Sequence, residues 1–548
     1  MNDNNEQIKK DLEETSSKEK MLKGSAWMTA GSIFSRILGA IYIIPWATWF
    51  GVNYLQANAL FTKGYTVYAL FLMLSTAGIP SAVGKQVAHY NSLNEYGIGR
   101  RLFKRSLGVM MFLGIISAMI LWFIAPLISQ GDAAVIPVYR SLAVTLLLIP
   151  VMSLTRGFFQ GYFDMAPFAI SQLVEQVARI VYMLAATYLI TQVLHGSYQS
   201  AVVQSTFAAF IGAVGGLLVL LWHYWRKRPT MNYLLAHSNN KLEVSDKRLI
   251  KEILYQSIPF IIIGSTTTLY NLFDQFSFPT IMSFVTNYST KEINALYALF
   301  AGNANKLIMI TISVAAAMAD TAIPLLAQAV TKNDNEEVSA ALLDSIELFF
   351  FVMLPCSFGM AAVSRPLYVL FYPYDYTGIF VLAFSSYIAL ALGLFMVLAA
   401  LLQGIYENTI AIKFAVIGMI IKVIIQFPLT AFLHVYGPLA ATGIGMTVSN
   451  VLIFRYLYFK YNLNINKLQK NTNMMMLFSL FMFIVVLVIS FALGKVTNTY
   501  SKFQSTIVLI IGAGIGGYIY AFLSLKARLA DDILGARANF LRRILRIK

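Results

Sequence analysis

The chain alternates between long apolar stretches and short polar connections over almost its whole length. A helix needs about 20 apolar residues to cross a hydrocarbon core of about 30 Å, and stretches of about this length recur fourteen times. The pattern therefore predicts an all-α polytopic membrane protein with about fourteen transmembrane helices. The predicted spans are residues 24–50, 65–89, 106–129, 137–160, 166–191, 199–225, 252–284, 295–330, 341–364, 377–403, 408–433, 438–460, 472–494 and 503–525.

The first twelve predicted spans form two sets of six that repeat one another. Pro80, in AGIP, has a counterpart in Pro324, in TAIP, 244 positions later, and Gln160-Gly161 has a counterpart in Gln403-Gly404, 243 positions later. Six is an even number, so both copies enter the membrane in the same direction. The sequence thus predicts two parallel six-helix repeats with a cleft between them, the usual place for a transporter's substrate.

This repeat gives an expected division of the chain. The expected parts are a cytoplasmic tail (1–23), an N-terminal six-helix bundle (24–225), a basic cytoplasmic linker (226–251), a C-terminal six-helix bundle (252–460), two additional transmembrane helices (472–525) and a basic amphipathic cytoplasmic tail (526–548).

Composition fits this membrane architecture. The chain is 58% hydrophobic and only 12% charged, and its formal net charge is +16. Lysine and arginine are concentrated in the connections after the second, sixth and twelfth spans, which predicts that both termini are cytoplasmic. The chain is therefore expected to be a multi-pass protein of the bacterial cell membrane. The positive charge therefore requires no nucleic acid partner. The single Cys356 excludes an internal disulfide, and the five scattered histidines lack ligand spacing, so no metal or cofactor is expected.

Charged residues inside the apolar spans are the candidate functional residues. Arg36 lies near the middle of the first span, where a charge costs about 2.5–3.5 kcal/mol unless it faces a wet cavity or a partner. Neither Arg36 nor Lys306 has an acid three or four residues away on its own helix, and Lys63 lies at the start of the second span. A cleft carrying such cations would bind a diphosphate or carboxylate. An ion pair that only fixes helix packing is the alternative for Arg36.

Acidic residues in the spans have two interpretations. A buried Asp274 facing the cleft could take a proton or a sodium ion and couple transport to an ion gradient, or it could form a salt bridge to a cation of the cleft. Net positive charge in the cleft would also let the membrane potential act on the carrier. Glu175 and Arg179 stand four residues apart with the acid first, which favours a pair within one helix.

Several motifs carry a resemblance to a known family. SRILG at 35–39, STAGIP at 75–80 and RGFFQGY at 156–162, with the arrangement of six, six and two spans, resemble the polysaccharide-exporter branch of the multidrug/oligosaccharidyl-lipid/polysaccharide (MOP) flippase superfamily. More narrowly, the chain is similar to the MurJ-type lipid II flippases of Gram-positive bacteria and their sporulation-protein relatives.

The resemblance implies a V-shaped bundle that alternates between inward-open and outward-open forms. It would carry undecaprenyl-diphosphate-linked peptidoglycan precursor (lipid II) to the outer leaflet, as a monomer among membrane lipids. The family's first-span arginine matches Arg36, its eighth-span arginine falls beside Lys306, and a second-span arginine has only Lys63 nearby. Gram-negative members also carry an Arg-Asp pair where this chain has Tyr42 and Ile43.

Three other functions remain open at this point. Another lipid-linked polysaccharide unit, of capsule, teichoic or spore-wall type, would use the same fold and the same cations. A multidrug exporter of the superfamily carries amphipathic cations, which a cationic cleft would repel. A membrane scaffold would tolerate neutralisation of the buried charges. A membrane-embedded glycan-synthesising enzyme is not expected, because it would need acidic residues in a sizeable extracytoplasmic loop, and those connections are all short.

Overall fold

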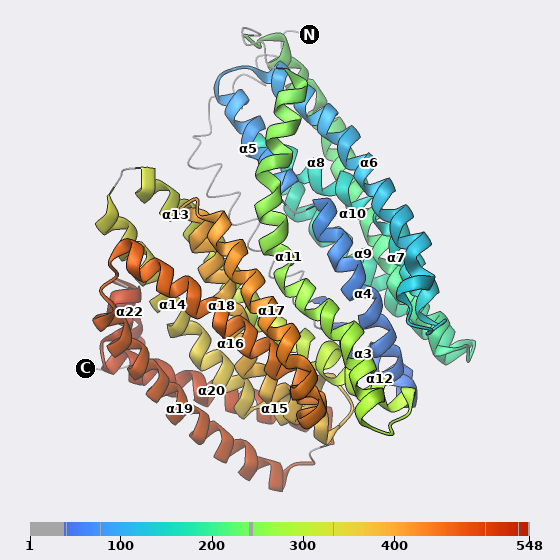
Figure 1. Ribbon diagram of the computed structural model, residues 1–548, viewed down its shortest axis with the longest axis vertical. Helices are drawn as coiled ribbons and strands as arrows, with labels where there is room; N and C mark the ends of the chain where they lie inside the picture. Colours follow the sequence, from blue (N-terminus) through green and yellow to red (C-terminus); the bar gives the residue numbers. More distant parts are fainter. Residues whose placement is uncertain are drawn as a thin grey trace. The chain divides into compact units, whose positions relative to one another are not determined.

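A computed structural model describes residues 38–39, 41–76, 78–239, 245–331, 334–498, 500–534 and 536–545, and none of these residues lies in a β-strand. Ten helical segments of this part of the chain are long and apolar enough to cross a membrane. The predicted all-α membrane fold is therefore confirmed (Figure 1). The helices are α3 (Ile43–Phe50), η1 (Gly51–Asn53), α4 (Tyr54–Thr76), α5 (Ile79–Ser92), α6 (Tyr96–Ile128), α7 (Val135–Thr145), α8 (Ile149–Gly161), α9 (Ala166–Tyr188), η2 (Leu189–Val193), α10 (Tyr198–Ala236), α11 (Asp246–Val285), α12 (Thr290–Tyr297), η3 (Ala298–Ala304), α13 (Asn305–Thr331), α14 (Asn335–Ala362), α15 (Ser364–Phe371), α16 (Tyr376–Gly404), α17 (Asn408–Leu433), η4 (His434–Tyr436), α18 (Gly437–Tyr461), α19 (Ile465–Val496), α20 (Lys502–Lys526), α21 (Leu529–Leu534) and α22 (Ala536–Leu545).

The chain divides into two compact units, residues 1–269 and 270–548, and the division falls within α11. In the first unit α9 packs along α10, α5 lies against α8, and α7 contacts α4, α6 and α10. In the second unit α17 packs along α18, and α16 contacts α13, α14 and α18. Helix α10 continues to Ala236, so the start of the expected linker is helical.

Two of the predicted spans in the first unit are broken helices. Gly78 separates α4 from α5 with a φ of +78°, a backbone conformation that residues with a Cβ rarely adopt. A Cβ at Gly78 would also lie only 3.1 Å from Cα of Ser257 in α11. Pro80 and Pro150 stand in the first turns of α5 and α8, where their missing N–H groups cost nothing. The counterpart of Gly78, Ala322, lies within the continuous helix α13.

The two units share a turn that the sequence repeat anticipates. The turn between α8 and α9 places Phe163 in the left-handed region (φ 57°), and the turn between α16 and α17 does the same with Tyr406 (φ 62°), 243 positions later. The acid that follows each of these residues pairs with a lysine on the last helix of its own set of six. Asp164 binds Lys227 at 2.6 Å, and Glu407 binds Lys460. The repeat is therefore visible in side-chain contacts as well as in sequence.

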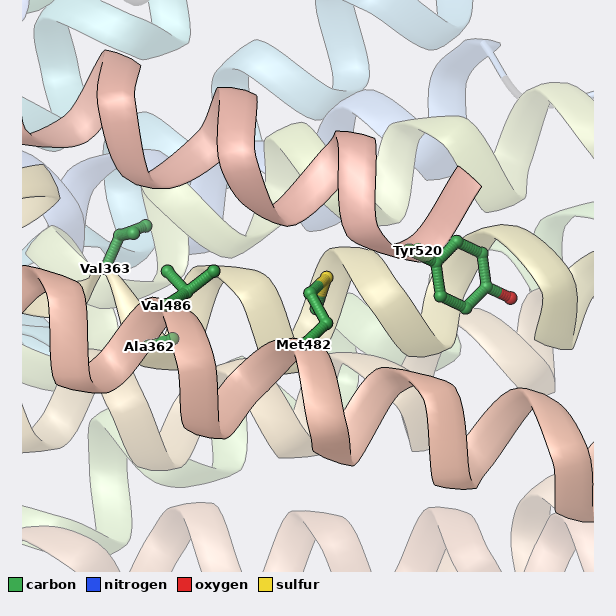
Figure 2. Close-up of a cluster of buried hydrophobic side chains, with 5 residues drawn as sticks. All are labelled: Ala362, Val363, Met482, Val486 and Tyr520. Carbon is green, nitrogen blue, oxygen red and sulfur yellow. The ribbon is translucent and has the colours of Figure 1, made fainter. Parts of the chain in front are cut away.

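The last two long helices, α19 and α20, pack against the other helices of the second unit and against each other through small residues. Figure 2 shows Val363, at the junction of α14 and α15, with Met482 and Val486 of α19 and Tyr520 of α20. A Cβ added to Gly512 would lie 3.0 Å from Val363, and one added to Gly516 would lie 3.0 Å from Val486. Close helix packing is therefore the role of this glycine pair.

The C-terminal basic segment forms a helix that docks on its neighbours. Ala538 of α22 is buried with Leu525 and Ala530. Arg542 donates hydrogen bonds to the carbonyl of Leu525 at the end of α20 and pairs with Asp531 at 2.6 Å. A cation at a helix C-terminus is favourable because unpaired carbonyls gather there.

Candidate functional site

The second unit contains a buried charge pair that joins α11 to α17. Lys422 Nζ lies 2.7 Å from Asp274 Oδ1, and the two side chains are 0% and 8% exposed. Gln426, one turn farther along α17, donates Nε2 to the same carboxylate oxygen at 2.8 Å. Lys422 also donates to Thr442 of α18 at 2.6 Å, and its ammonium stands 4.9 Å from the centre of the Tyr270 ring. The network therefore links three helices.

This pair bears on the two roles considered for Asp274. Burying two opposite charges costs little stability only when the charges contact each other and their remaining polar atoms form further hydrogen bonds. The contacts of Asp274 and Lys422 meet both conditions. The structure thus contains the salt bridge that was one of the alternatives. Coupling to an ion gradient through Asp274 stays a prediction.

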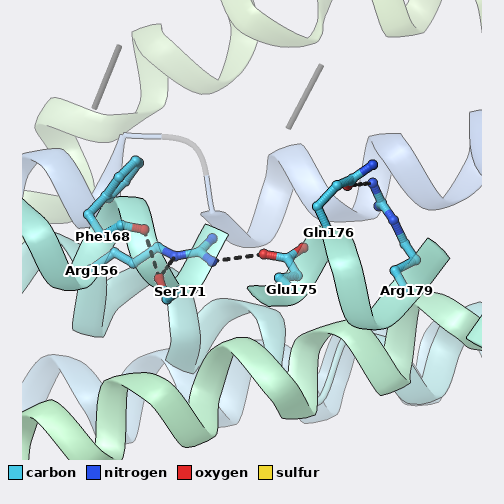
Figure 3. A network of polar contacts seen from close by, with 6 residues as sticks. All are labelled: Arg156, Phe168, Ser171, Glu175, Gln176 and Arg179. Atoms are coloured by element: carbon cyan, nitrogen blue, oxygen red, sulfur yellow. Dashed lines mark hydrogen bonds and ion pairs between the residues drawn. The ribbon is translucent and has the colours of Figure 1, made fainter. Parts of the chain in front are cut away.

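The first unit carries a second polar network, on α8 and α9 (Figure 3). Arg156, from the RGFFQGY motif, places NH2 2.8 Å from Glu175 Oε2 and donates Nε to Ser171 Oγ at 2.9 Å. Its guanidinium also stands 5.6 Å from the centre of the Phe168 ring. The predicted pair between Glu175 and Arg179 was therefore wrong, because Glu175 takes its partner from α8.

Arg179 is a further candidate for binding an anion, although the sequence analysis gave it only a structural role in an ion pair. It donates a hydrogen bond to the amide oxygen of Gln176, and its side chain is partly exposed. Within the described ranges no carboxylate lies at ion-pair distance from Arg179. The signal that could have found it is the repeat, since Arg179 and Lys422 stand 243 positions apart on equivalent helices.

Lys306 lies at the start of α13, two residues after the π-helical segment η3 ends. A π-helix widens the turn, and such segments occur frequently at functional sites. The side chain of Lys306 is partly exposed, whereas that of Lys422 is wholly enclosed by its network. Of these two lysines of the second unit, Lys306 is the more exposed.

Two tyrosines hold the π-helical segment in place. Tyr368 lies in the last turn of α15, and Tyr372 directly follows this helix. Asn303, fully buried in η3, donates Nδ2 to Tyr368 Oη at 2.7 Å. Tyr372 Oη in turn donates to the backbone carbonyl of Asn303 at 3.2 Å. These bonds occupy backbone and side-chain groups three residues before Lys306, so they position the turn from which this lysine projects.

Replacement of Tyr368 by phenylalanine is expected to destabilise the protein by about 1–3 kcal/mol, because it removes the hydroxyl that accepts a hydrogen bond from the buried amide of Asn303. The measurement is the free energy of unfolding of the purified protein. Tyr374→Phe is the matched control, since Tyr374 is a partly buried neighbour whose contacts with described residues are ring contacts. Equal stability of the two variants would contradict this role of Tyr368.

The remaining predicted site residues lie in different parts of the chain. Lys63, on α4, pairs with Asp132 in the connection between α6 and α7 at 3.2 Å, with 12% of its side chain exposed. Arg36 lies outside the described residues. Lys63 belongs to the first unit, whereas Asp274 and Lys306 belong to the second. A shared diphosphate site for Arg36, Lys63 and Lys306 therefore stays a prediction.

Similarity to known proteins identifies the family. The family described as polysaccharide biosynthesis protein matches residues 21–330. The chain is also 33% identical to the lipid II flippase MurJ of Bacillus subtilis (strain 168) over 536 residues, which cover 94% of this chain and 97% of that relative. The chain belongs to the polysaccharide biosynthesis protein family.

A further relative and two solved structures are also similar to this chain. The stage V sporulation protein B of Bacillus subtilis (strain 168) is 27% identical over 208 residues, which are 37% of this chain and 39% of that protein. An inward closed structure of lipid II flippase MurJ matches with a TM-score of 0.61 at 14% identity, covering 92% of this chain and 99% of that one. An inward-facing multidrug resistance transporter of the MOP superfamily matches with a TM-score of 0.60 at 15% identity, covering 78% and 94%. These structures show that the chain has the MOP fold, and its 33% identity to a flippase over nearly its full length makes it a membrane transporter rather than an enzyme.

Proposed function

We propose that this chain is a flippase that moves undecaprenyl-diphosphate-linked peptidoglycan precursor, lipid II, from the inner to the outer leaflet of the cell membrane by alternating access. The observation that carries the proposal is the 33% identity to a lipid II flippase over almost the whole of both chains. The distribution of lysine and arginine among the connections supports a cytoplasmic position for both termini.

The diphosphate is assigned to partly exposed cations of the spans. Lys306 and Arg179 are partly exposed, and Arg179 is hydrogen-bonded to a neutral amide. Arg36 joins them on the strength of the sequence. Lys63 assists only when it leaves Asp132, which holds it in this structure. An arginine can grip a phosphate through two parallel hydrogen bonds, whereas a lysine acts as a point charge.

Lys306→Ala is expected to lower lipid II flipping about ten- to a hundredfold, because the lost charge-assisted contact is worth about 1.5–3 kcal/mol. The measurement is surface-exposed lipid II in cells depleted of their own flippase. The cells carry the intact chain, Lys306→Ala, Arg36→Ala or an empty vector, at matched membrane levels.

The control is Lys495→Ala, which removes an exposed lysine at the end of α19. Full transport by both Lys306→Ala and Arg36→Ala would overturn the assignment of the diphosphate to these cations. If the intact chain inserts but restores no exposure, the lipid II proposal itself fails.

A second candidate is a flippase for another lipid-linked polysaccharide unit. The similarity to a sporulation protein favours this alternative. It predicts that the intact chain leaves lipid II exposure unchanged but restores surface display of a different undecaprenyl-linked polymer in a strain that lacks the corresponding flippase.

A further inference from the structure

The second unit contains a cavity that none of the transport residues lines. It has a volume of about 700 Å³ and lies among α14, α16, α18 and α19. Its inner wall is apolar and includes the buried side chains of Ile346, Leu398 and Leu468. Volumes of about 300–1,000 Å³ are typical of sites that enclose small molecules. The cavity is therefore large enough to hold part of a ligand.

Two buried polar atoms at this cavity have no hydrogen-bond partner among the described residues. Asn450, which is 4% exposed, donates Nδ2 to the carbonyl of Ala391 at 2.8 Å, yet among the described residues nothing donates to its Oδ1. The hydroxyl of Thr472 is likewise buried and has no partner in the described chain. Both residues line the cavity. Buried polar atoms are nearly always hydrogen-bonded, so these two mark where a polar group of an occupant would lie.

A cation stands at the rim of the same cavity. Arg455 is exposed, and no carboxylate of the described residues forms an ion pair with it. Its guanidinium rests 5.7 Å from the centre of the Phe459 ring. The exposed amides of Gln469 and Asn473, on α19, line the cavity as well. The rim thus offers one positive charge and several neutral hydrogen-bonding groups, which suits a single anionic group with hydroxyls beside it.

Arg455 also lines a second, largely apolar cavity along α18. This one has a volume of about 490 Å³ and is bounded by Phe414, Leu452 and Tyr456, with Lys460, which is paired with Glu407, at its edge. The guanidinium of Arg455 therefore borders two largely apolar spaces. A phosphodiester that carries two acyl chains has this distribution of charge and apolar surface, whereas a polyprenyl diphosphate carries only one chain.

We propose that the cavity among α14, α16, α18 and α19 is a binding site for an anionic diacyl phospholipid with a hydroxyl-bearing headgroup. The phosphate meets Arg455, the headgroup hydroxyls donate to Asn450 and Thr472, and the acyl chains occupy the two apolar spaces. The site is separate from the proposed diphosphate site, and its test does not depend on transport.

The test is lipid retention by the purified full chain, measured by native mass spectrometry after reconstitution in nanodiscs of phosphatidylglycerol or of phosphatidylcholine. The intact protein is expected to retain phosphatidylglycerol about tenfold more than phosphatidylcholine, because both lipids offer a phosphate to Arg455 but only phosphatidylglycerol offers hydroxyls to Asn450 and Thr472. Arg455→Gln is expected to lower retention of phosphatidylglycerol about tenfold, because the phosphate loses its charge-assisted contact. Ala391→Phe, which fills the cavity, lowers retention of both lipids.

Lys470→Gln is the matched control, because Lys470 is an exposed cation of α19 that does not line the cavity. If Arg455→Gln and Lys470→Gln retain phosphatidylglycerol equally well, the proposal is overturned. A parallel arm adds sn-glycerol 1-phosphate as competitor. Displacement of the lipid at equimolar competitor would mean that the site binds a free phosphate group, which also overturns the proposal.

Discussion

Asp274→Leu is expected to destabilise the protein by about 3–5 kcal/mol and to lower its level in the membrane. The substitution leaves Lys422, whose side chain is 0% exposed, as a buried charge without its counter-ion, and removal of one partner of a buried pair has about this cost. Gln426 loses its acceptor on the carboxylate at the same time. The measurement is the free energy of unfolding of the purified protein, together with its abundance in membranes.

The double variant Asp274→Leu/Lys422→Met is expected to recover most of this loss, because a buried ion pair replaced by apolar residues of similar volume is often neutral in stability. Lys413→Met is the control, since it removes an exposed lysine of the same helix. If Asp274→Leu alone is as stable as the intact protein, the charge on Lys422 is not held by Asp274.

The same double variant tests the coupling role of Asp274. If the pair is structural only, the refolded double variant transports with its dependence on ion gradients unchanged. If Asp274 takes the coupling ion, the double variant folds but its transport no longer responds to the gradient. Transport measured with and without dissipation of the sodium and proton gradients separates the two outcomes.

Gly157→Leu is expected to prevent the first unit from folding. A Cβ at Gly157 would lie 2.3 Å from the carbonyl oxygen of Pro80, and one at Gly84 would lie 2.8 Å from the carbonyl oxygen of Gly157. In both contacts the added Cβ would collide with backbone atoms of the facing helix, so α5 and α8 would have to separate. Overpacking costs about 1–3 kcal/mol where side chains can move, and a larger loss is expected where backbone must move.

The control for this variant is Gly108→Leu in α6, where a new Cβ would meet nothing within 4 Å. Membrane abundance and resistance to limited proteolysis are the measurements. Gly157→Leu should be degraded while Gly108→Leu accumulates normally. Accumulation of both variants to the same level would show that the contact between α5 and α8 is dispensable.

The sequence was sufficient to predict the spans because a membrane helix is specified by length and apolarity, which are local properties. The predicted span 408–433 coincides with α17, and 438–460 differs from α18 by one residue at each end. The breaks were harder to place. The α4–α5 break depends on the positive φ of Gly78 and on its contact with α11, and neither can be read from local composition.

The polar contacts of the site were predictable only in part, because their partners are distant in sequence. Asp274 and Lys422 are separated by 148 positions and meet only when α11 packs on α17. For Glu175 the local rule favoured Arg179, one helical turn away, but Arg156 on the neighbouring helix forms the ion pair. Tertiary packing thus decided which of two well-spaced cations the carboxylate binds.

The π-helical segment before Lys306 also determines how this span can be compared with other chains. An α-helix turns about 100° per residue, so a wide turn that accommodates an extra residue rotates all following side chains by about that angle. In a related chain whose helix is regular at this point, the residue aligned with Lys306 would lie on a different face of the helix. The sequence neighbour of that residue would point in the direction of Lys306. Equivalent side chains in this span are therefore found by helix face, and an alignment without a one-residue gap would assign the wrong position.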